Sequence, residues 1–270
     1  MKISIITISL NQAEFLERAI RSVVEQEYAE IEYIVVDAGS TDGSRQIIDR
    51  YRDRIAHVIE EPDKGPPDGL NKGFALASGE ICGYLNADDE FLPGAFTEAA
   101  SAFARDPSLD VINGHGYIVD RENRVIRRFC SSRFDRFRHA YGAAVVIQQS
   151  TFFRRSAFID VGGFNIENRT CWDGELMLDM AMKGKRFGLV DGYWSLFRVY
   201  GDSISGSQRL RHISVENWDR LFEKAMGRKK KPMDGVIRIL MRVEKWLFDP
   251  VAPFLRLWEK IVGTPRINTF

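Results

Sequence analysis

The chain has 270 residues, of which 44% are hydrophobic, so it can build one large domain or one domain with an appendage. Lysine plus arginine and aspartate plus glutamate each number 38, which argues against a generally basic nucleic-acid binder. The three cysteines lie far apart, which indicates reduced thiols and neither a disulfide framework nor a zinc site. With no signal-peptide cleavage site and no apolar stretch of membrane-spanning length, we expect a cytoplasmic protein, soluble or on a membrane surface.

Residues 1–92 alternate predicted strands and helices. Apolar β-branched runs indicate the strands, and apolar residues spaced three and four apart indicate the helices. The prolines and glycines of "PDKGPPDG", residues 62–69, predict a loop. The alternation predicts βαβ units and a largely parallel sheet. The strands are expected over residues 3–8, 31–37, 56–61 and 81–86, and the helices over 12–26, 45–54 and 70–78.

The pattern changes after residue 92. Residues 110–129 predict a hairpin of two strands around "DREN". A short helix ending at Gly162-Gly163 is expected within 147–164, and a longer one over 171–185. Residues 187–200 predict a strand or a pair of strands, and from about residue 214 the chain turns helical, rich in tryptophan and basic.

Polar residues follow four of the predicted strands. In open parallel sheets, ligands bind at the carboxyl ends of the strands. Four such ends with several aspartates at one sheet edge indicate an anionic pocket suited to a cation and a hydroxyl-rich ligand. The residues concerned are Thr7, Ser9 and Asn11, then Asp37, then Glu61 to Asp63, then Asn86, Asp88 and Asp89.

Asp88 and Asp89 are adjacent carboxylates, which repel each other unless they are solvated or paired with a cation. They can cap the helix expected after Pro93, or they can hold a divalent metal together with a nucleotide diphosphate. Asp37 likewise either begins a turn or accepts hydrogen bonds from a base or ribose. Neither a G-x-G-x-x-G fingerprint nor a P-loop occurs, so a dinucleotide site and a P-loop NTPase are both poorly supported.

Four motifs in this order resemble the family 2 inverting glycosyltransferases, which have a GT-A fold. They are "ISIITISLNQAEFLERAIRSVVEQ", "IEYIVVDAGSTDGS", "EPDKGPPDGLNKGFALASGEICGYLNADDEF" and "GGF…WDGEL". The resemblance extends from residue 1 to about residue 205. It implies an α/β fold with a Rossmann-like, mainly parallel twisted sheet flanked by helices, followed here by a C-terminal helical extension.

The resemblance also implies roles for individual residues. Asp88 and Asp89 would hold Mn²⁺ or Mg²⁺, and Asp173 would be the general base that deprotonates the acceptor hydroxyl. A helix N-cap is the alternative reading of Asp173. The residues expected to bind the nucleotide sugar are Thr7, Ser9, Asn11, Asp37, Asp63, Lys64, Asn71, Lys72, Asn86 and Asp88.

Some positions depart from the family pattern. Leu10 stands where an aromatic residue often packs on the base, and Asn86 stands at the first position of the D-x-D motif. Tyr200 takes the place of a metal-ligating histidine of some members, and Asp179 that of an arginine. These changes leave open a catalytically impaired nucleotide-sugar-binding or scaffold protein as the alternative to an enzyme.

We expect a glycosyltransferase domain over residues 1–213, with a nucleotide-binding half (1–92) and an acceptor half (93–213), followed by a basic, tryptophan-rich helical extension (214–270). The extension either attaches to an anionic membrane surface, at the inner face of the cell membrane, or packs on the domain or a partner subunit. The expected enzyme is a metal-dependent, inverting hexosyl- or related transferase of cell-surface polysaccharide synthesis. Its donor would be a nucleoside-diphosphate sugar, with UDP favoured over GDP or dTDP, and its acceptor a glycan or lipid-linked glycan.

Overall fold

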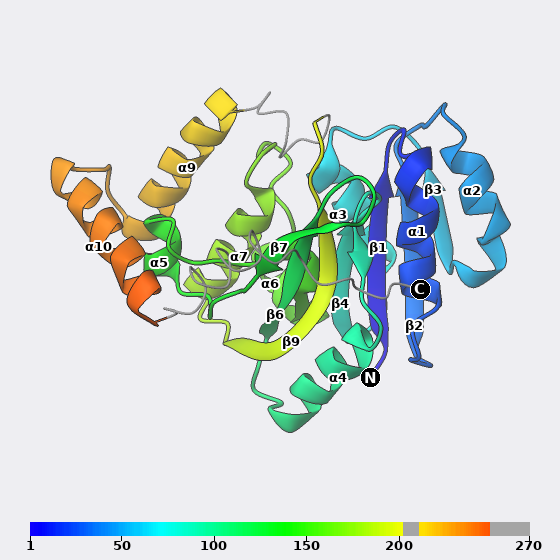
Figure 1. Cartoon of the computed structure of the whole chain (residues 1–270), viewed down its shortest axis with the longest axis horizontal. Coiled ribbons are helices and arrows are strands. Elements are labelled where there is room, and N and C mark those ends of the chain that lie inside the picture. The colour runs from blue at the N-terminus through cyan, green and yellow to red at the C-terminus, as the bar shows by residue number, and fades with distance from the viewer. Residues whose placement is uncertain (202–210, 249–270) are drawn as a thin grey trace.

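A computed structural model describes residues 1–201 and 211–248 of the chain (Figure 1). Within them, nine strands form one sheet in the order β3-β2-β1-β4-β8-β6-β9-β5, with β7 paired to β6. Figure 1 shows helices on both faces of this sheet and the C-terminal helices α9 and α10 at one end of the molecule.

The first half of the sheet is parallel, as the alternation of strands and helices predicts. Its strands are β1 (Ile3–Ser9), β2 (Ile31–Asp37), β3 (His57–Glu60) and β4 (Ile81–Asn86), connected by α1 (Ala13–Val24), α2 (Ser44–Arg50), the single turn η1 (Arg52–Arg54) and α3 (Pro66–Leu76). The expected loop over 62–69 is therefore too long, because α3 begins at Pro66. Proline is tolerated in the first turn of a helix, where its missing N–H has no partner to lose.

The second half of the sheet is mixed, with β8 antiparallel to both β4 and β6, and β9 parallel to β6. The predicted hairpin is present as β6 and β7. Residues 151–154 form strand β8, where the sequence pattern predicts only a helix, because four residues are too few to show a strand periodicity. The elements are β5 (Glu90–Phe91), α4 (Ala95–Arg105), β6 (Val111–Val119), β7 (Val125–Phe129), α5 (Arg136–Ala140), η2 (Gln148–Ser150), β8 (Thr151–Arg154), α6 (Arg155–Val161), α7 (Trp172–Met182) and β9 (Phe187–Arg198).

The chain ends, as far as it is described, with α9 (Arg211–Met226) and α10 (Pro232–Phe248). The rest of the predicted extension, residues 249–270, lies outside the described residues. None of the described helices combines the length and the apolar character that crossing a bilayer requires.

The core has two parts, one on each face of the sheet. Ile3 and Ile5 of β1 belong to a cluster with side chains of α1, α2 and α4, while Ile6 belongs to the cluster with side chains of α3, α6, α7 and α9. Successive side chains of a strand point to opposite faces, so β1 is buried on both sides and reads as a continuous apolar run. This double cover leaves the strand ends as the place where polar side chains gather.

Candidate functional site

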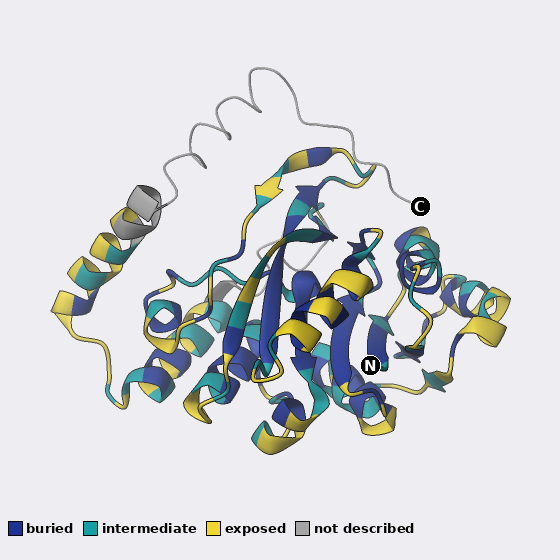
Figure 2. Cartoon of the chain, turned by 90° about the horizontal axis from the view of Figure 1, so that it is seen from below, coloured by how far each residue is buried: buried dark blue, intermediate teal, exposed yellow. Residues whose placement is uncertain are grey.

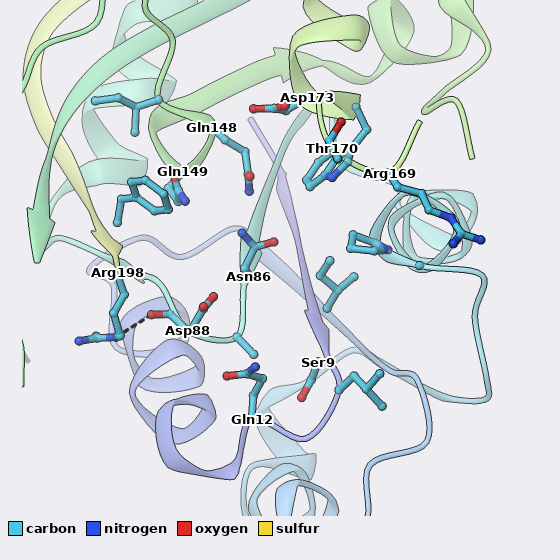
Figure 3. Close-up of a pocket in the computed structure, with 18 of the residues that line it drawn as sticks. Ser9, Gln12, Asn86, Asp88, Gln148, Gln149, Arg169, Thr170, Asp173 and Arg198 are labelled. Carbon is cyan, nitrogen blue, oxygen red and sulfur yellow. Dashed lines mark hydrogen bonds between the residues drawn. The ribbon is translucent and has the colours of Figure 1, made fainter. Parts of the chain in front are cut away.

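A cavity of about 510 Å³ opens at the carboxyl ends of β1 and β4 (Figure 3). The strand ends contribute Ser9, Asn86 and Asp88 to its lining. These residues form one wall, the strand-end wall. The second wall is formed by residues later in the chain, which include Gln148, Arg169 and Asp173. Figure 3 shows Asp88 and Asp173 on different sides of the cavity, with Asn86 and Gln148 between them.

Two neighbouring strand ends carry buried oxygen atoms without a hydrogen-bond partner. Ser9 and Asp37 are paired in register at the ends of β1 and β2. The Oδ1 atom of Asp37 accepts the backbone N–H groups of Gly39 and Ser40, at 3.1 and 2.7 Å. Its Oδ2 atom and the Ser9 hydroxyl have no partner within the described chain. Buried polar groups are nearly always paired, and Ser9 lines the cavity, so a polar ligand there can complete its hydroxyl. Asp37 is 0% exposed and lies outside the cavity lining.

The adjacent carboxylates Asp88 and Asp89 have different surroundings. Asp89 is 1% exposed, and its Oδ1 accepts the backbone N–H of Arg198 at 2.9 Å. Its Oδ2 accepts the side-chain amides of Gln149 and Asn86, at 2.6 and 3.2 Å. Both oxygens of Asp89 are thereby occupied, and its side chain is directed into the protein. Asp88 faces the cavity, where its Oδ2 accepts the hydroxyl of Tyr200 at 3.2 Å.

Burial raises the pKa of both carboxyls, and the neighbouring Asp88 raises that of Asp89 further. Arg198 supplies positive charge next to them. Its buried guanidinium donates to the Asp88 carbonyl oxygen at 2.8 Å and to a Glu90 carboxylate oxygen at 2.6 Å. Neither aspartate caps a helix, because the N-cap position of α4 is Gly94. The turn that follows β4 is therefore held by Arg198, which leaves Asp88 directed toward the cavity.

Asp173 lies in the first turn of α7, where the N-cap position is Cys171. Burial raises the pKa of its carboxyl, while the N–H of Gly174 acts in the opposite direction. The preceding Trp172 packs edge-on against Phe164, with ring centroids 5.3 Å apart, and contacts Tyr84 of β4 at 5.6 Å. The aromatic contacts fix the start of α7 against the sheet. A carboxylate with a raised pKa at a cavity wall is suited to accept a proton.

Glu175, one half-turn after Asp173, joins three segments of the chain. It is 1% exposed and accepts both guanidinium N–H groups of Arg220 in α9, at 2.7 and 2.6 Å. It also accepts Lys224 of α9 at 3.0 Å and the amide of Asn168 at 2.7 Å. Burial alone would raise the pKa of Glu175, but these donors outweigh it and lower the pKa to about 2. Glu175 therefore fixes α7, α9 and the loop before α7 relative to one another.

Several residues that the resemblance assigns to the nucleotide sugar lie outside the cavity lining. The Thr7 hydroxyl accepts from Tyr33 at 3.0 Å in the core. Asn11 accepts the N–H of Thr41 and so connects the end of β1 to the loop after β2. Lys72 donates a hydrogen bond to the carbonyl oxygen of Pro62. Asn71 pairs with both backbone groups of Phe164. Lys64 is exposed, whereas Asp63 does line the cavity, and burial raises its pKa.

The cavity also contains polar residues that the sequence patterns do not single out. They are Gln12, Gln148, Gln149, Arg169, Thr170 and Arg198. The Nε2 atom of Gln148 is buried and has no partner within the described chain, so it is a third group available to a ligand. A signal was present in "AAVVIQQS", where two amides directly follow an apolar run. That is the same arrangement that marks the ends of β1 and β4.

The oxygen atoms at the cavity can hold a divalent cation only if a bound substrate supplies further oxygen atoms. Within residues 1–201 and 211–248, no three His, Cys, Asp or Glu side chains gather into a metal-binding cluster. Mg²⁺ is commonly held by one or two carboxylates and by phosphate oxygens of the substrate. Asp88 meets that requirement, since its carboxylate lines the cavity and accepts one side-chain hydrogen bond, from Tyr200 to Oδ2. The oxygens of Asp89 are already taken by N–H donors.

Comparisons with known proteins agree with this arrangement. The model of the family "Glycosyl transferase family 2" matches residues 4–162. An uncharacterized glycosyltransferase of Nostoc sp. is 35% identical over 130 residues, which cover 45% of this chain and 40% of the relative. A Campylobacter jejuni protein named GalNAc(5)-diNAcBac-PP-undecaprenol beta-1,3-glucosyltransferase is 35% identical over 100 residues, 36% of this chain and 32% of the relative. The chain thus spans less than half the length of these two relatives.

Two solved structures share the fold. Staphylococcus aureus TarS, residues 1–349, in complex with UDP-GlcNAc superposes with a TM-score of 0.64 at 19% identity, covering 84% of this chain and 72% of that 1–349 chain. The mannosyltransferase PcManGT of Pyrobaculum calidifontis, in complex with GDP-Man and Mn²⁺, superposes with a TM-score of 0.65 at 19% identity. The match covers 98% of this chain and 76% of the PcManGT chain. The expected α/β fold with a sheet between helices is confirmed by these neighbours. The family model covers more than half of the chain, and the protein is a member of glycosyltransferase family 2.

Proposed function

We propose that the protein is a metal-dependent, inverting glycosyltransferase that uses a nucleoside-diphosphate sugar. The observation that carries the proposal is that Asp88 and Asp173 line one cavity from different walls (Figure 3). An inverting transfer needs one charged group near the departing diphosphate and one base near the incoming hydroxyl. A single carboxylate could not act at both groups, because the acceptor hydroxyl approaches the anomeric carbon from the side opposite the departing diphosphate.

Asp173 is proposed as the base. Its carboxylate takes the proton of the acceptor hydroxyl while the new bond from that oxygen to the anomeric carbon forms. The bond from the anomeric carbon to the diphosphate oxygen breaks in the same step, and the nucleoside diphosphate leaves with the electron pair. The raised pKa of Asp173 favours this role, because a more basic carboxylate is the better proton acceptor.

Ser9, Asp37 and Asp63 are proposed to bind the nucleoside. The unpaired oxygens of Ser9 and Asp37 can accept N–H groups of a base or ribose hydroxyls. UDP remains our first candidate, with GDP and dTDP as alternatives, since TarS is a UDP-GlcNAc complex and PcManGT a GDP-Man complex. Arg169 adds a positive charge at the cavity that complements a diphosphate.

Asp88 is the proposed protein ligand of Mn²⁺ or Mg²⁺, and Asp89 a residue that fixes the turn. The bound cation would neutralise negative charge on the diphosphate. Tyr200 donates a hydrogen bond to Asp88 and thereby orients its carboxylate. The Mn²⁺ in the PcManGT complex supports a cation in this fold.

We propose a glycan or lipid-linked glycan of cell-surface polysaccharide synthesis as the acceptor, and a cytoplasmic location for the reaction. The name of the Campylobacter relative, a transferase acting on an undecaprenol-linked glycan, supports this class of acceptor. The fold does not set the acceptor, because specificity within one fold depends on the site alone.

A donor panel tests the proposal. The protein would be incubated with Mn²⁺ or Mg²⁺ and UDP-, GDP- and dTDP-sugars, and released nucleoside diphosphate would be measured. We expect release with one donor, and a loss of about 10³-fold in Asp173→Asn with donor binding retained. Asp53→Asn, at an exposed position in η1 and outside the cavity lining, is the control and should keep its rate.

Two results would contradict the proposal. Unchanged turnover in Asp173→Asn would remove Asp173 from the reaction. Tight nucleotide binding without release from any donor, with or without glycan acceptors, would instead favour the nucleotide-sugar-binding scaffold.

A further inference from the structure

Helix α10 is anchored to the rest of the protein along one side. Asp234, in its first turn, is 5% exposed and accepts the hydroxyl of Tyr141 at 2.7 Å. It also accepts two N–H groups of Arg228, at 2.7 and 2.8 Å. Ile237 and Met241, one and two turns further along, pack against the hydrophobic cluster that includes residues of α7 and α9. These contacts fix which face of α10 is turned toward the protein.

The outer face of α10 is apolar and exposed. Its side chains recur at spacings of three and four residues, so they form one stripe along the helix. Their exposed fractions lie between 48% and 66%, and Figure 2 shows α10 projecting from one end of the molecule with exposed residues along it. The stripe consists of Met233, Val236, Ile239, Leu240 and Val243.

An exposed stripe of this kind is unusual within the described residues. They contain fourteen exposed large hydrophobic side chains, five of which belong to this one 17-residue helix. The other nine are spread over the strands, helices and loops of the catalytic domain and α9. Single exposed apolar residues are ordinary, whereas a contiguous group indicates a contact surface.

The charge beside the stripe is strongly positive. Residues 228–248 contain seven Lys or Arg and two acidic residues, in a chain whose formal net charge is zero. One of the two acids, Asp234, is already bound to Arg228. Lys229 and Lys231 directly precede the helix, and Arg238 is exposed on the side between its two faces. A partner for this surface must offer apolar contact and negative charge together.

We propose that the outer stripe of α10 docks on the surface of an anionic lipid bilayer. The apolar side chains would enter the boundary between head groups and acyl chains, and Lys229, Lys231 and Arg238 would lie among anionic head groups. Since none of the described helices can span a bilayer, α10 would lie in the plane of the surface. A second copy of the chain is a poorer occupant, because a symmetric contact through α10 would bring two basic segments together.

This inference goes beyond the proposed function and does not depend on it. Attachment concerns α10 alone, and the cavity lining contains no residue of that helix. If both hold, the bilayer would concentrate the enzyme on the surface where a lipid-linked acceptor resides.

Vesicle flotation with the full-length protein tests the proposal. We expect the wild type to float with phosphatidylglycerol-containing vesicles at low ionic strength and not with pure phosphatidylcholine vesicles. The triple variant Val236→Gln, Ile239→Gln, Leu240→Gln should lower the vesicle partition coefficient by about tenfold or more. A matched triple of exposed residues elsewhere, Ile126→Gln, Ile159→Gln and Leu189→Gln, should bind like the wild type.

The same preparations distinguish the other occupants of the stripe. Equal flotation of the wild type and the α10 triple, or no flotation of the wild type, would overturn the proposal. A wild-type dimer in light scattering that becomes a monomer in the α10 triple variant would overturn the proposal too. Vesicle binding that appears only after truncation behind Phe248 would show that residues 249–270 cover the stripe, and would overturn it as well. Because flotation needs neither donor nor acceptor, its outcome is separate from that of the donor panel.

Discussion

The two walls of the cavity are built in different ways. Ser9, Asn86 and Asp88 stand at or directly after the ends of adjacent parallel strands, whose register is set by backbone hydrogen bonds. Gln148, Arg169 and Asp173 come from a single helical turn, a loop and the start of a helix. Strand ends of a doubly covered sheet are fixed by the core beneath them. The second wall has no such continuous support.

Besides the aromatic packing of Trp172 at the start of α7, the second wall depends on a few long-range polar contacts. Asn71 in α3 holds both backbone groups of Phe164, and Glu175 gathers Asn168, Arg220 and Lys224. We infer that the strand-end wall keeps its geometry when single contacts are lost, whereas the second wall does not. The following predictions compare the two walls, from the largest expected effect to the smallest.

Glu175→Gln should destabilise the second wall. The substitution leaves Arg220 and Lys224 without their carboxylate partner. Because both side chains are partly exposed to water, the loss of stability is limited. We expect a loss of about 2–3 kcal/mol in the free energy of unfolding, measured by urea titration. Glu223→Gln, at an exposed position of α9, is the control and should change the stability little. Equal stability of the two variants would show that Glu175 does not hold the second wall.

The pH dependence of transfer should report the raised pKa of Asp173. Only the ionised carboxylate accepts a proton, so kcat/KM should fall as the pH falls through that pKa. Because burial raises the pKa, the acid limb should lie above the ordinary range of an aspartate. Donor affinity measured at each pH separates this effect from titration of the donor site. An acid limb at or below the ordinary aspartate range would argue against Asp173 as the base.

Stability should depend on pH through Glu175 in the acidic range. Its pKa is about 2 in the folded protein, below the value of an unfolded glutamate, so the folded state binds this proton more weakly. The stabilisation is therefore complete above about pH 4.5 and is lost as the pH falls toward 2. Melting temperatures of wild type and Glu175→Gln should converge over that window, and parallel curves would contradict the assignment.

Arg169→Ala should have the smallest effect. Arg169 is exposed at the cavity, and no hydrogen bond joins its side chain to the described residues 1–201 and 211–248, so its loss should leave the fold intact. We expect a severalfold rise in the KM for the donor with kcat nearly unchanged, since an exposed charge contributes about 1 kcal/mol or less. Arg136→Ala, exposed on α5, is the control. A fall in kcat with KM unchanged would instead place Arg169 at the reacting bond.

The sequence patterns located the strand-end wall better than the second wall, for a physical reason. Ser9, Asn86 and Asp88 follow from one local rule, because buried parallel strands bring their carboxyl ends to one edge. The same rule could not separate Asp88 from Asp89, since that difference depends on Arg198 and Gln149, 109 and 60 positions away in sequence.

The second wall has no local signature of comparable strength. Asp173 was assigned only through the resemblance to the family, and Arg169 was not singled out, because both lie on segments placed by distant contacts. Strand β8 was missed for a similar reason, as its four residues are defined by pairing with β4 and β6. The helical extension after residue 213 was predicted more directly, since helical spacing and a run of basic residues are local features of the sequence.

The central claim is that Asp88, through a divalent cation, anchors the diphosphate at the strand-end wall. Calorimetric titration of UDP and GDP with and without Mn²⁺ tests it most directly, with Asp53→Asn, exposed in η1 and outside the cavity lining, as the control. We predict that Mn²⁺ strengthens nucleotide binding to wild type and control, and that Asp88→Asn loses this gain, about tenfold or more. Equal Mn²⁺-dependent affinity in wild type and Asp88→Asn would contradict the claim.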